Sequence, residues 1–132
     1  MMKNHVRYLI LALSIFTCMS SVSAQDAIDS VVRPFLQALQ TGDVKTLESC
    51  IAGGLYDRTK VLLTKNTDYP EFLRTRYASV EFSVGAVEHL PDETLVHVYA
   101  DSPSSSQLRY TLVLKPMQNQ SWKIVDQREF QR

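Results

Sequence analysis

A change in the spacing of apolar residues near residue 79 constrains this fold more than any other feature of the sequence. Before that point apolar residues recur at helical spacing, and after it they alternate with polar ones. The clearest helical stripe contains Ile28, Val31, Val32, Phe35, Leu36 and Leu39. The clearest alternation contains Leu108, Tyr110, Leu112 and Leu114. Helices followed by a meander of strands predict an α+β domain, with N-terminal helices packed on one face of a four-stranded antiparallel sheet.

The first helix has recognisable ends and one irregular position. Asp26 is predicted to be its N-cap, and Gly42 is predicted to end it in the left-handed conformation. Pro34 lies inside this helix and has no backbone N–H to donate. We therefore expect the helix to bend near residue 30.

Three shorter helices are expected before the sheet. Asp43 is positioned to cap the second, which Gly53-Gly54 should end, and residues 55–65 form the third. The segment 68–71 (Asp-Tyr-Pro-Glu) combines a cap residue, a first-turn proline and a capping-box glutamate, so the fourth helix should begin there. The side chains predicted to face the core from these helices are Val44, Leu47, Cys50, Ile51, Leu55, Leu62, Leu63, Phe72, Leu73 and Tyr77.

Strict alternation also predicts the inward faces of the other strands. Residues 94–100 form the second strand, rich in β-branched and aromatic residues. The inward residues of the first strand are Val80, Phe82, Val84 and Ala86. In the last strand Trp122, Ile124 and Phe130 mark one face, and the same alternation places Asp126 on it.

Residues 1–24 have the pattern of a secretory signal peptide. Lys3 and Arg7 precede an apolar stretch, and the segment ends in Val22-Ser23-Ala24, with the small residues that a signal peptidase accepts. We expect cleavage after Ala24, which leaves residues 25–132 as a single secreted or periplasmic domain. An apolar run of about a dozen residues is too short for a membrane anchor, since a span needs roughly 20. A lipoprotein anchored through Cys18 is the alternative, which the preceding Phe16 and Thr17 fit poorly.

Composition excludes several classes of protein. Fourteen basic residues balance fourteen acidic ones, and no basic stripe is present, so we expect no nucleic-acid partner. After cleavage Cys50 is the single cysteine, which rules out an intramolecular disulfide, and its place on an apolar stripe predicts burial. His89 and His97 match no metal-ligand spacing, and no glycine-rich phosphate loop or nucleophile elbow is present. We therefore expect neither a metal nor a cofactor.

Three segments resemble known proteins. They are residues 32–43, which end in Gly-Asp, residues 47–51 followed by Leu55-Tyr56, and the Trp-Lys-Ile motif within residues 120–126. Their order is similar to that of the nuclear transport factor 2-like superfamily, which has the cystatin-like fold, and the nearest branch resembles secreted lumazine-binding-like proteins of unknown function. The resemblance implies a curved sheet wrapped around the first helix, a conical cavity between them, and a homodimer through the outer sheet face. At the position of Pro34 these proteins usually have a small or charged residue, so the sequence departs from their pattern there.

Proteins with a fold of this kind have many different activities, so function must be argued from the residues of the candidate site. The leading interpretation is a non-enzymatic domain that binds a small apolar ligand or a protein partner. A second is a cofactor-free isomerase or dehydratase that uses Asp126 and Tyr110; against it, Asp126 could lie at the wet end of its strand and pair with Arg128. A third is a structural dimerisation module whose outer sheet face carries Leu95, His97 and Tyr99. The candidate ligand-binding residues are Phe35, Tyr56, Phe82, Tyr110 and Trp122.

Overall fold

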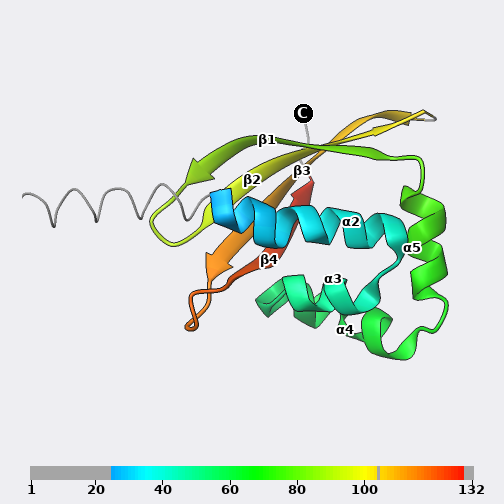
Figure 1. Cartoon of the computed structure of the whole chain (residues 1–132), viewed down its shortest axis with the longest axis horizontal. Coiled ribbons are helices and arrows are strands. Elements are labelled where there is room, and N and C mark those ends of the chain that lie inside the picture. The colour runs from blue at the N-terminus through cyan, green and yellow to red at the C-terminus, as the bar shows by residue number, and fades with distance from the viewer. Residues whose placement is uncertain (1–24, 104, 130–132) are drawn as a thin grey trace, which may run out of the picture.

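The computed structural model describes residues 25–103 and 105–129. Helices occupy the first half of these residues, and a four-stranded antiparallel sheet of order β1-β2-β3-β4 occupies the second half. The helices cover one face of the sheet (Figure 1). This arrangement confirms the α+β prediction. The predicted signal peptide, Cys18 and Phe130 lie outside the described residues.

The first helix is continuous through Pro34 because its preceding turn is a π-helix. The chain is already helical at Gln25, passes through η1 (Ile28–Val32) and continues as α2 (Arg33–Thr41). The N–H of Arg33 donates to the carbonyl of Ile28, five residues back. The irregularity expected near residue 30 thus takes the form of this wider turn. The prediction that Asp26 caps the helix is wrong, since helix precedes it.

The second helix begins as predicted and ends earlier than predicted. Gly42 adopts a φ of 71°, and the Asp43 side chain then accepts a hydrogen bond from the N–H of Thr46 at the start of α3 (Val44–Cys50). Ile51 is extended and forms a parallel bridge with Ile124 of the last strand. Gly53 and Gly54 therefore begin α4 (Gly53–Lys65) instead of ending α3.

The remaining helix, α5 (Tyr69–Tyr77), packs against α2. Leu73 is buried and Tyr77 is partly buried, as predicted. Phe72 is 57% exposed, and Leu62 of α4 is 40% exposed, so their predicted core positions are wrong. Each helix contacts the rest of the molecule along one narrow side, and these two side chains lie beside that contact instead of within it.

The sheet comprises β1 (Glu81–His89), β2 (Thr94–Ser102), β3 (Ser105–Pro116) and β4 (Trp122–Glu129). Two bulges interrupt its alternation. In β1 the register shifts between Val84 and Val87, so Ala86 is exposed instead of inward. In β4 Ile124 pairs with Leu114 and Asp126 pairs with Val113, which leaves Val125 without a partner. The extra residue turns Asp126 to the outer face.

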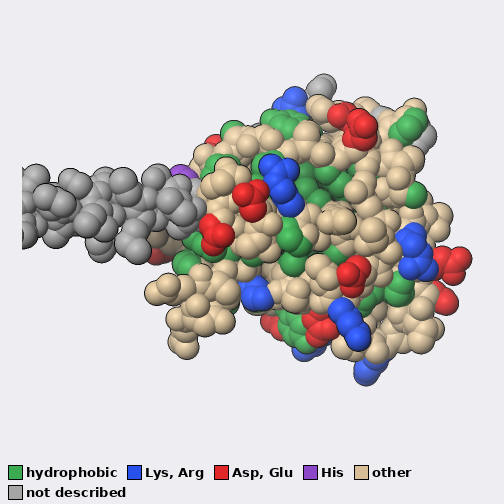
Figure 2. Space-filling view, viewed as in Figure 1, with side chains coloured by type: hydrophobic (Ala, Val, Ile, Leu, Met, Phe, Trp, Pro, Cys, Tyr) green, Lys and Arg blue, Asp and Glu red, His purple; other side chains and the backbone are tan. Residues whose placement is uncertain are grey.

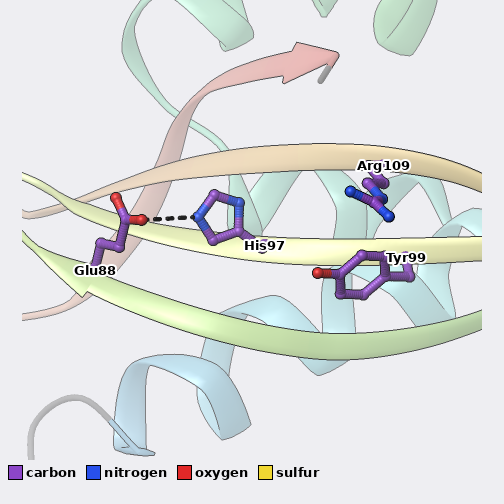
Figure 3. Close-up of a pocket in the computed structure, with 4 residues that line it drawn as sticks. All are labelled: Glu88, His97, Tyr99 and Arg109. Carbon is purple, nitrogen blue, oxygen red and sulfur yellow. Dashed lines mark ion pairs between the residues drawn. The ribbon is translucent and has the colours of Figure 1, made fainter. Parts of the chain in front are cut away.

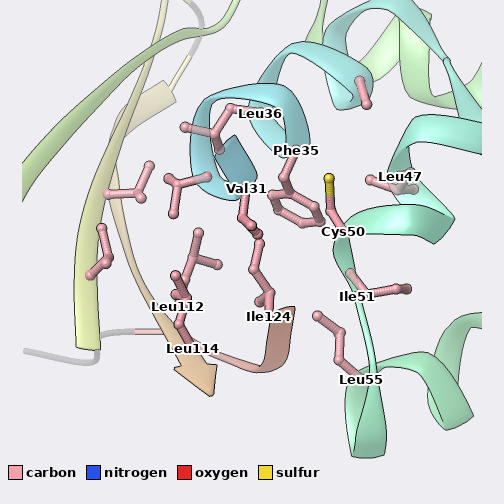
Figure 4. Close-up of a cluster of buried hydrophobic side chains, with 14 of the residues drawn as sticks. Val31, Phe35, Leu36, Leu47, Cys50, Ile51, Leu55, Leu112, Leu114 and Ile124 are labelled. Carbon is pink, nitrogen blue, oxygen red and sulfur yellow. The ribbon is translucent and has the colours of Figure 1, made fainter. Parts of the chain in front are cut away.

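The inward face of the sheet and the helices share one apolar core (Figure 4). Phe35 of α2 points into it and lies near Leu112 and Ile124, which are almost completely buried. Cys50 is also buried, as predicted. None of the helices in the described part of the chain has the length and apolar character needed to cross a membrane.

Candidate functional site

A cavity of about 130 Å³ lies between the helices and the end of β4. Its floor is formed by buried or partly buried apolar residues contributed by all four helical segments from α2 to α5, and its rim by Thr59 of α4 and the more exposed residues of α5. The rim supplies polar groups, namely the Thr59 hydroxyl, the Tyr69 and Tyr77 phenols and the Arg76 guanidinium. The complete lining is Phe35, Leu39, Leu47, Ile51, Leu55, Thr59, Tyr69, Phe72, Leu73, Arg76, Tyr77 and Gln127. We call this space the helix cavity.

The space between α2 and the sheet is nearly filled. It holds only about 10 Å³, which is no more than a single water molecule requires. Its lining shares Phe35, Leu39, Tyr77 and Gln127 with the helix cavity, so the two spaces adjoin. The cone implied by the family resemblance is therefore packed at its sheet end and open at its helix end.

The structure brings together three of the five predicted ligand-binding residues. Phe35, Phe82 and Tyr110 line the filled end of the cone, and Phe35 also lines the helix cavity. Trp122 instead borders a separate surface hollow beside Lys123. Tyr56 packs partly buried against the core and lines none of these cavities.

Sequence reasoning missed the residues that α5 contributes to the helix cavity. Tyr69, Phe72, Leu73, Arg76 and Tyr77 recur at spacings of three and four residues, so they lie on one side of that helix. This spacing was visible in the sequence. It could not show that the side faces a cavity, because an aromatic stripe of this kind usually packs into a core.

Burial favours the neutral form of two phenols, Tyr69 at the helix cavity and Tyr110 at the filled end of the cone. Burial raises the pKa of Tyr69, and the neighbouring Tyr77 raises it further. Burial likewise raises the pKa of Tyr110, with Tyr77 and Glu129 adding to the effect and Arg76 opposing it. These hydroxyls can donate hydrogen bonds at neutral pH. Among the described residues, no carboxylate lines the helix cavity.

Asp126 lies away from both spaces. Its carboxylate accepts hydrogen bonds from Arg58 Nη2 of α4 at 2.6 Å and from Arg128 Nε at 3.3 Å, and its side chain is 32% exposed. Burial alone raises the pKa of this carboxyl, but hydrogen bonds from Arg58, the Gln127 N–H and Arg128 together lower it. The isomerase hypothesis required Asp126 inside the cavity within reach of Tyr110. That geometry is absent, and the predicted pairing with Arg128 is confirmed.

A second hollow, of about 230 Å³, lies on the outer sheet face, opposite the helices (Figure 3). It is lined by Glu88, His97, Tyr99 and Arg109. His97 Nε2 lies 3.4 Å from Glu88 Oε1, and its Nδ1 shares a hydrogen bond with the buried Thr111 hydroxyl. The Arg109 guanidinium lies over the Tyr99 ring at 5.5 Å. The four side chains thus contact one another in two pairs, Glu88 with His97 and Tyr99 with Arg109. The homodimer predicted through this face stays a prediction.

The distribution of charged and metal-ligating side chains can be described for the visible surface and for the described residues. On the face shown in Figure 2, acidic and basic side chains are interspersed, so no single-sign patch covers it. Within residues 25–103 and 105–129, no group of three or more His, Cys, Asp or Glu side chains is placed to hold a metal ion.

Comparison with known proteins gives one structural match. No protein-family model matches the sequence, and no curated protein matches it. A Campylobacter jejuni crystal structure at 2.00 Å, provisionally described as an NTF2-like transpeptidase, superposes with a TM-score of 0.51. It is 13% identical, and the match covers 70% of this chain and 91% of that one.

A structural match at 13% identity shows a shared fold but does not indicate a shared activity. The described helices and sheet have the same order and arrangement that the resemblance implied. The likeness to lumazine-binding-like proteins stays a prediction. The chain therefore has the nuclear transport factor 2-like fold.

Proposed function

We propose that this protein is a binding domain that holds the apolar part of a small molecule in the helix cavity. The observation that carries the proposal is the composition of that cavity. Six aliphatic or aromatic residues form its interior, and a few polar groups converge on its rim. Ligand sites in proteins commonly combine an apolar wall with a small number of placed polar groups.

The size of the cavity limits the ligand. A dry apolar cavity of about 150 Å³ in another protein takes up benzene or xenon. The helix cavity, at about 130 Å³, matches a single aromatic ring or a short branched alkyl group. Any larger ligand would have to extend past the rim. Phe72 at the rim is 57% exposed and offers a surface for that outer part.

The residues favour binding over acyl or proton transfer. An isomerase of the type considered above needs an acid in the cavity, and the described lining contains none. The name of the Campylobacter protein suggests peptide-bond exchange, which needs an activated nucleophile. Cys50 is a poor one, because burial raises the pKa of its thiol and its side chain is almost inaccessible.

Binding of phenol tests the proposal, with a variant that fills the cavity. Leu39 lines the helix cavity, and Leu39→Phe should occupy the space that the ligand ring needs. Since burial of a ring of this size contributes about 1.5–3 kcal/mol, the variant should weaken phenol binding by about 10- to 100-fold. Ligand-observed NMR titration measures the dissociation constant.

Leu62→Phe is the matched control, because Leu62 lies on α4 outside the described lining of the cavity and is 40% exposed. It should bind phenol as the unmodified protein does. Equal affinity in the Leu39 and Leu62 variants would contradict the proposal, provided that circular dichroism shows both folded.

We propose further that the protein acts after export, as a secreted or periplasmic domain. The charged start, apolar stretch and small-residue end of residues 1–24 support this. Mass spectrometry of the protein from its native host should show a chain that begins at Gln25. A chain that retains residues 1–24 would exclude cleavage at this site, and a lipid-modified Cys18 would indicate the lipoprotein alternative.

A further inference from the structure

We infer that the ligand of the helix cavity is a small carboxylic acid, whose ring or alkyl group enters the cavity and whose carboxylate binds Arg76. The inference rests on the proposed function and adds the chemical class of the ligand. It depends on three observations about Arg76: its position, the absence of an acidic partner among the described residues, and its contact with Tyr77.

Arg76 is the only cationic residue in the described lining of the helix cavity. It lies in the last turn of α5, so its long side chain can cross the rim while its guanidinium stays in contact with solvent. An anion at the rim therefore meets one positive charge and, within the described lining, no negative one.

Arg76 forms no ion pair with any described carboxylate. The arginines that do are Arg33, Arg58 and Arg128, which pair with Asp29 or Asp126 away from the cavity. Glu129 lies on the inward face near Tyr110 but lines neither space of the cone. The guanidinium of Arg76 thus keeps its donors available for a ligand.

The Tyr77 ring orients Arg76. The guanidinium carbon lies 5.8 Å from the centre of that ring, within the range of a cation–π contact. A guanidinium in such a contact can still form two parallel hydrogen bonds to a carboxylate through its N–H edge. The Tyr69 and Tyr77 hydroxyls line the same rim and can donate further hydrogen bonds.

Size and charge together define the ligand class. The cavity accommodates about one aromatic ring, and the cation lies at its rim, so the carboxylate should be attached directly to the ring or through a short linker. Benzoate and benzamide have nearly the same shape and differ in charge. Comparison of the two isolates the contribution of Arg76.

The test is isothermal titration of the full mature chain with benzoate and with benzamide. We expect benzoate to bind about tenfold more tightly at low salt, because hydrogen bonds to a charged partner contribute about this factor. Arg76→Gln should reduce benzoate affinity to that of benzamide and leave benzamide unchanged. Added NaCl should weaken benzoate binding alone.

Two controls separate charge from structure. Lys65→Gln removes one positive charge at the end of α4, outside the described cavity lining, and should leave both affinities unchanged. Arg76→Lys keeps the charge without the planar fork and should retain part of the preference for benzoate.

The outcomes distinguish this inference from the function on which it rests. If both compounds bind equally and Leu39→Phe weakens both, the cavity binds apolar groups but Arg76 selects no acid, which overturns the inference alone. The inference is also overturned, and the proposed function kept, if Arg76→Gln weakens both compounds equally. If neither compound binds, the proposed function fails and the inference fails with it.

Discussion

Substitution of Gly42 by alanine is expected to destabilise the protein by about 2–4 kcal/mol. The φ of Gly42 is 71°, where a side chain costs about 1–2 kcal/mol. A Cβ at this position would also lie less than 3.0 Å from the carbonyl oxygen of Pro70 in α5, an approach that real Cβ atoms essentially never make. Relief of that overlap requires α2 and α5 to separate, at a cost comparable to overpacking of a core. Urea unfolding followed by circular dichroism measures the loss.

Gly53 and Gly54 provide a graded control for this prediction. Gly53 has a φ of 57°, but its Cβ would meet Val125 at an ordinary 3.6 Å, so Gly53→Ala should cost only the backbone strain of about 1 kcal/mol. Gly54 has no positive φ, and its nearest neighbour is the flexible end of Arg58 at 3.3 Å, so Gly54→Ala should change stability by less than about 0.5 kcal/mol. Equal losses of stability in all three variants would mean that overlap with α5 is not the reason why alanine is unfavourable at position 42.

Truncation of Ile124 to alanine is expected to cost about 2–5 kcal/mol. Ile124 is completely buried at the point where β4 meets the helices, and it pairs both with Leu114 in the sheet and with Ile51 after α3. The cavity left by the missing carbons is enclosed by both layers, so neither layer can close it without moving the other. Because a domain of this kind is stabilised by about 5–15 kcal/mol, the variant should unfold at markedly lower urea concentration.

Val61→Ala is the control for this truncation, because Val61 is 56% exposed on α4. Its loss should change the free energy of unfolding by less than about 0.5 kcal/mol. An Ile124→Ala effect as small as that of Val61→Ala would mean that the bridge between Ile51 and Ile124 does not join the two layers.

The two bulges, in β1 and β4, are the positions at which alternation no longer predicted the inward face of a strand. Alternation correctly placed Phe82 and Val84 inward in β1, and then failed at Ala86, which lies within the bulge. It placed Ile124 inward in β4 and then failed at Asp126 for the same reason. The hypothesis of an acid catalyst depended on that second residue. Val125, which has no partner across the strand pair, therefore moved Asp126 out of the cavity and removed the basis of the isomerase hypothesis.

The helix cavity shows a different limit. Phe35, Leu39, Leu47, Ile51, Leu55 and Leu73 were all recognised as apolar positions of helices, and the structure uses every one of them in the lining. The sequence does not show that a small volume remains unfilled between these side chains. That depends on the angles at which α2, α4 and α5 meet, which arise from the packing of all of them.

Periodicity and end signals in the sequence by themselves determined the order of the elements, the α+β class and the inward faces of the regular segments, because each depends on residues a few positions apart. Only the tertiary structure decided the two bulges, the packed sheet end of the cone and the position of Arg76 at an open rim. These features depend on how strands pair and helices pack across long stretches of chain, and no local pattern specifies that geometry.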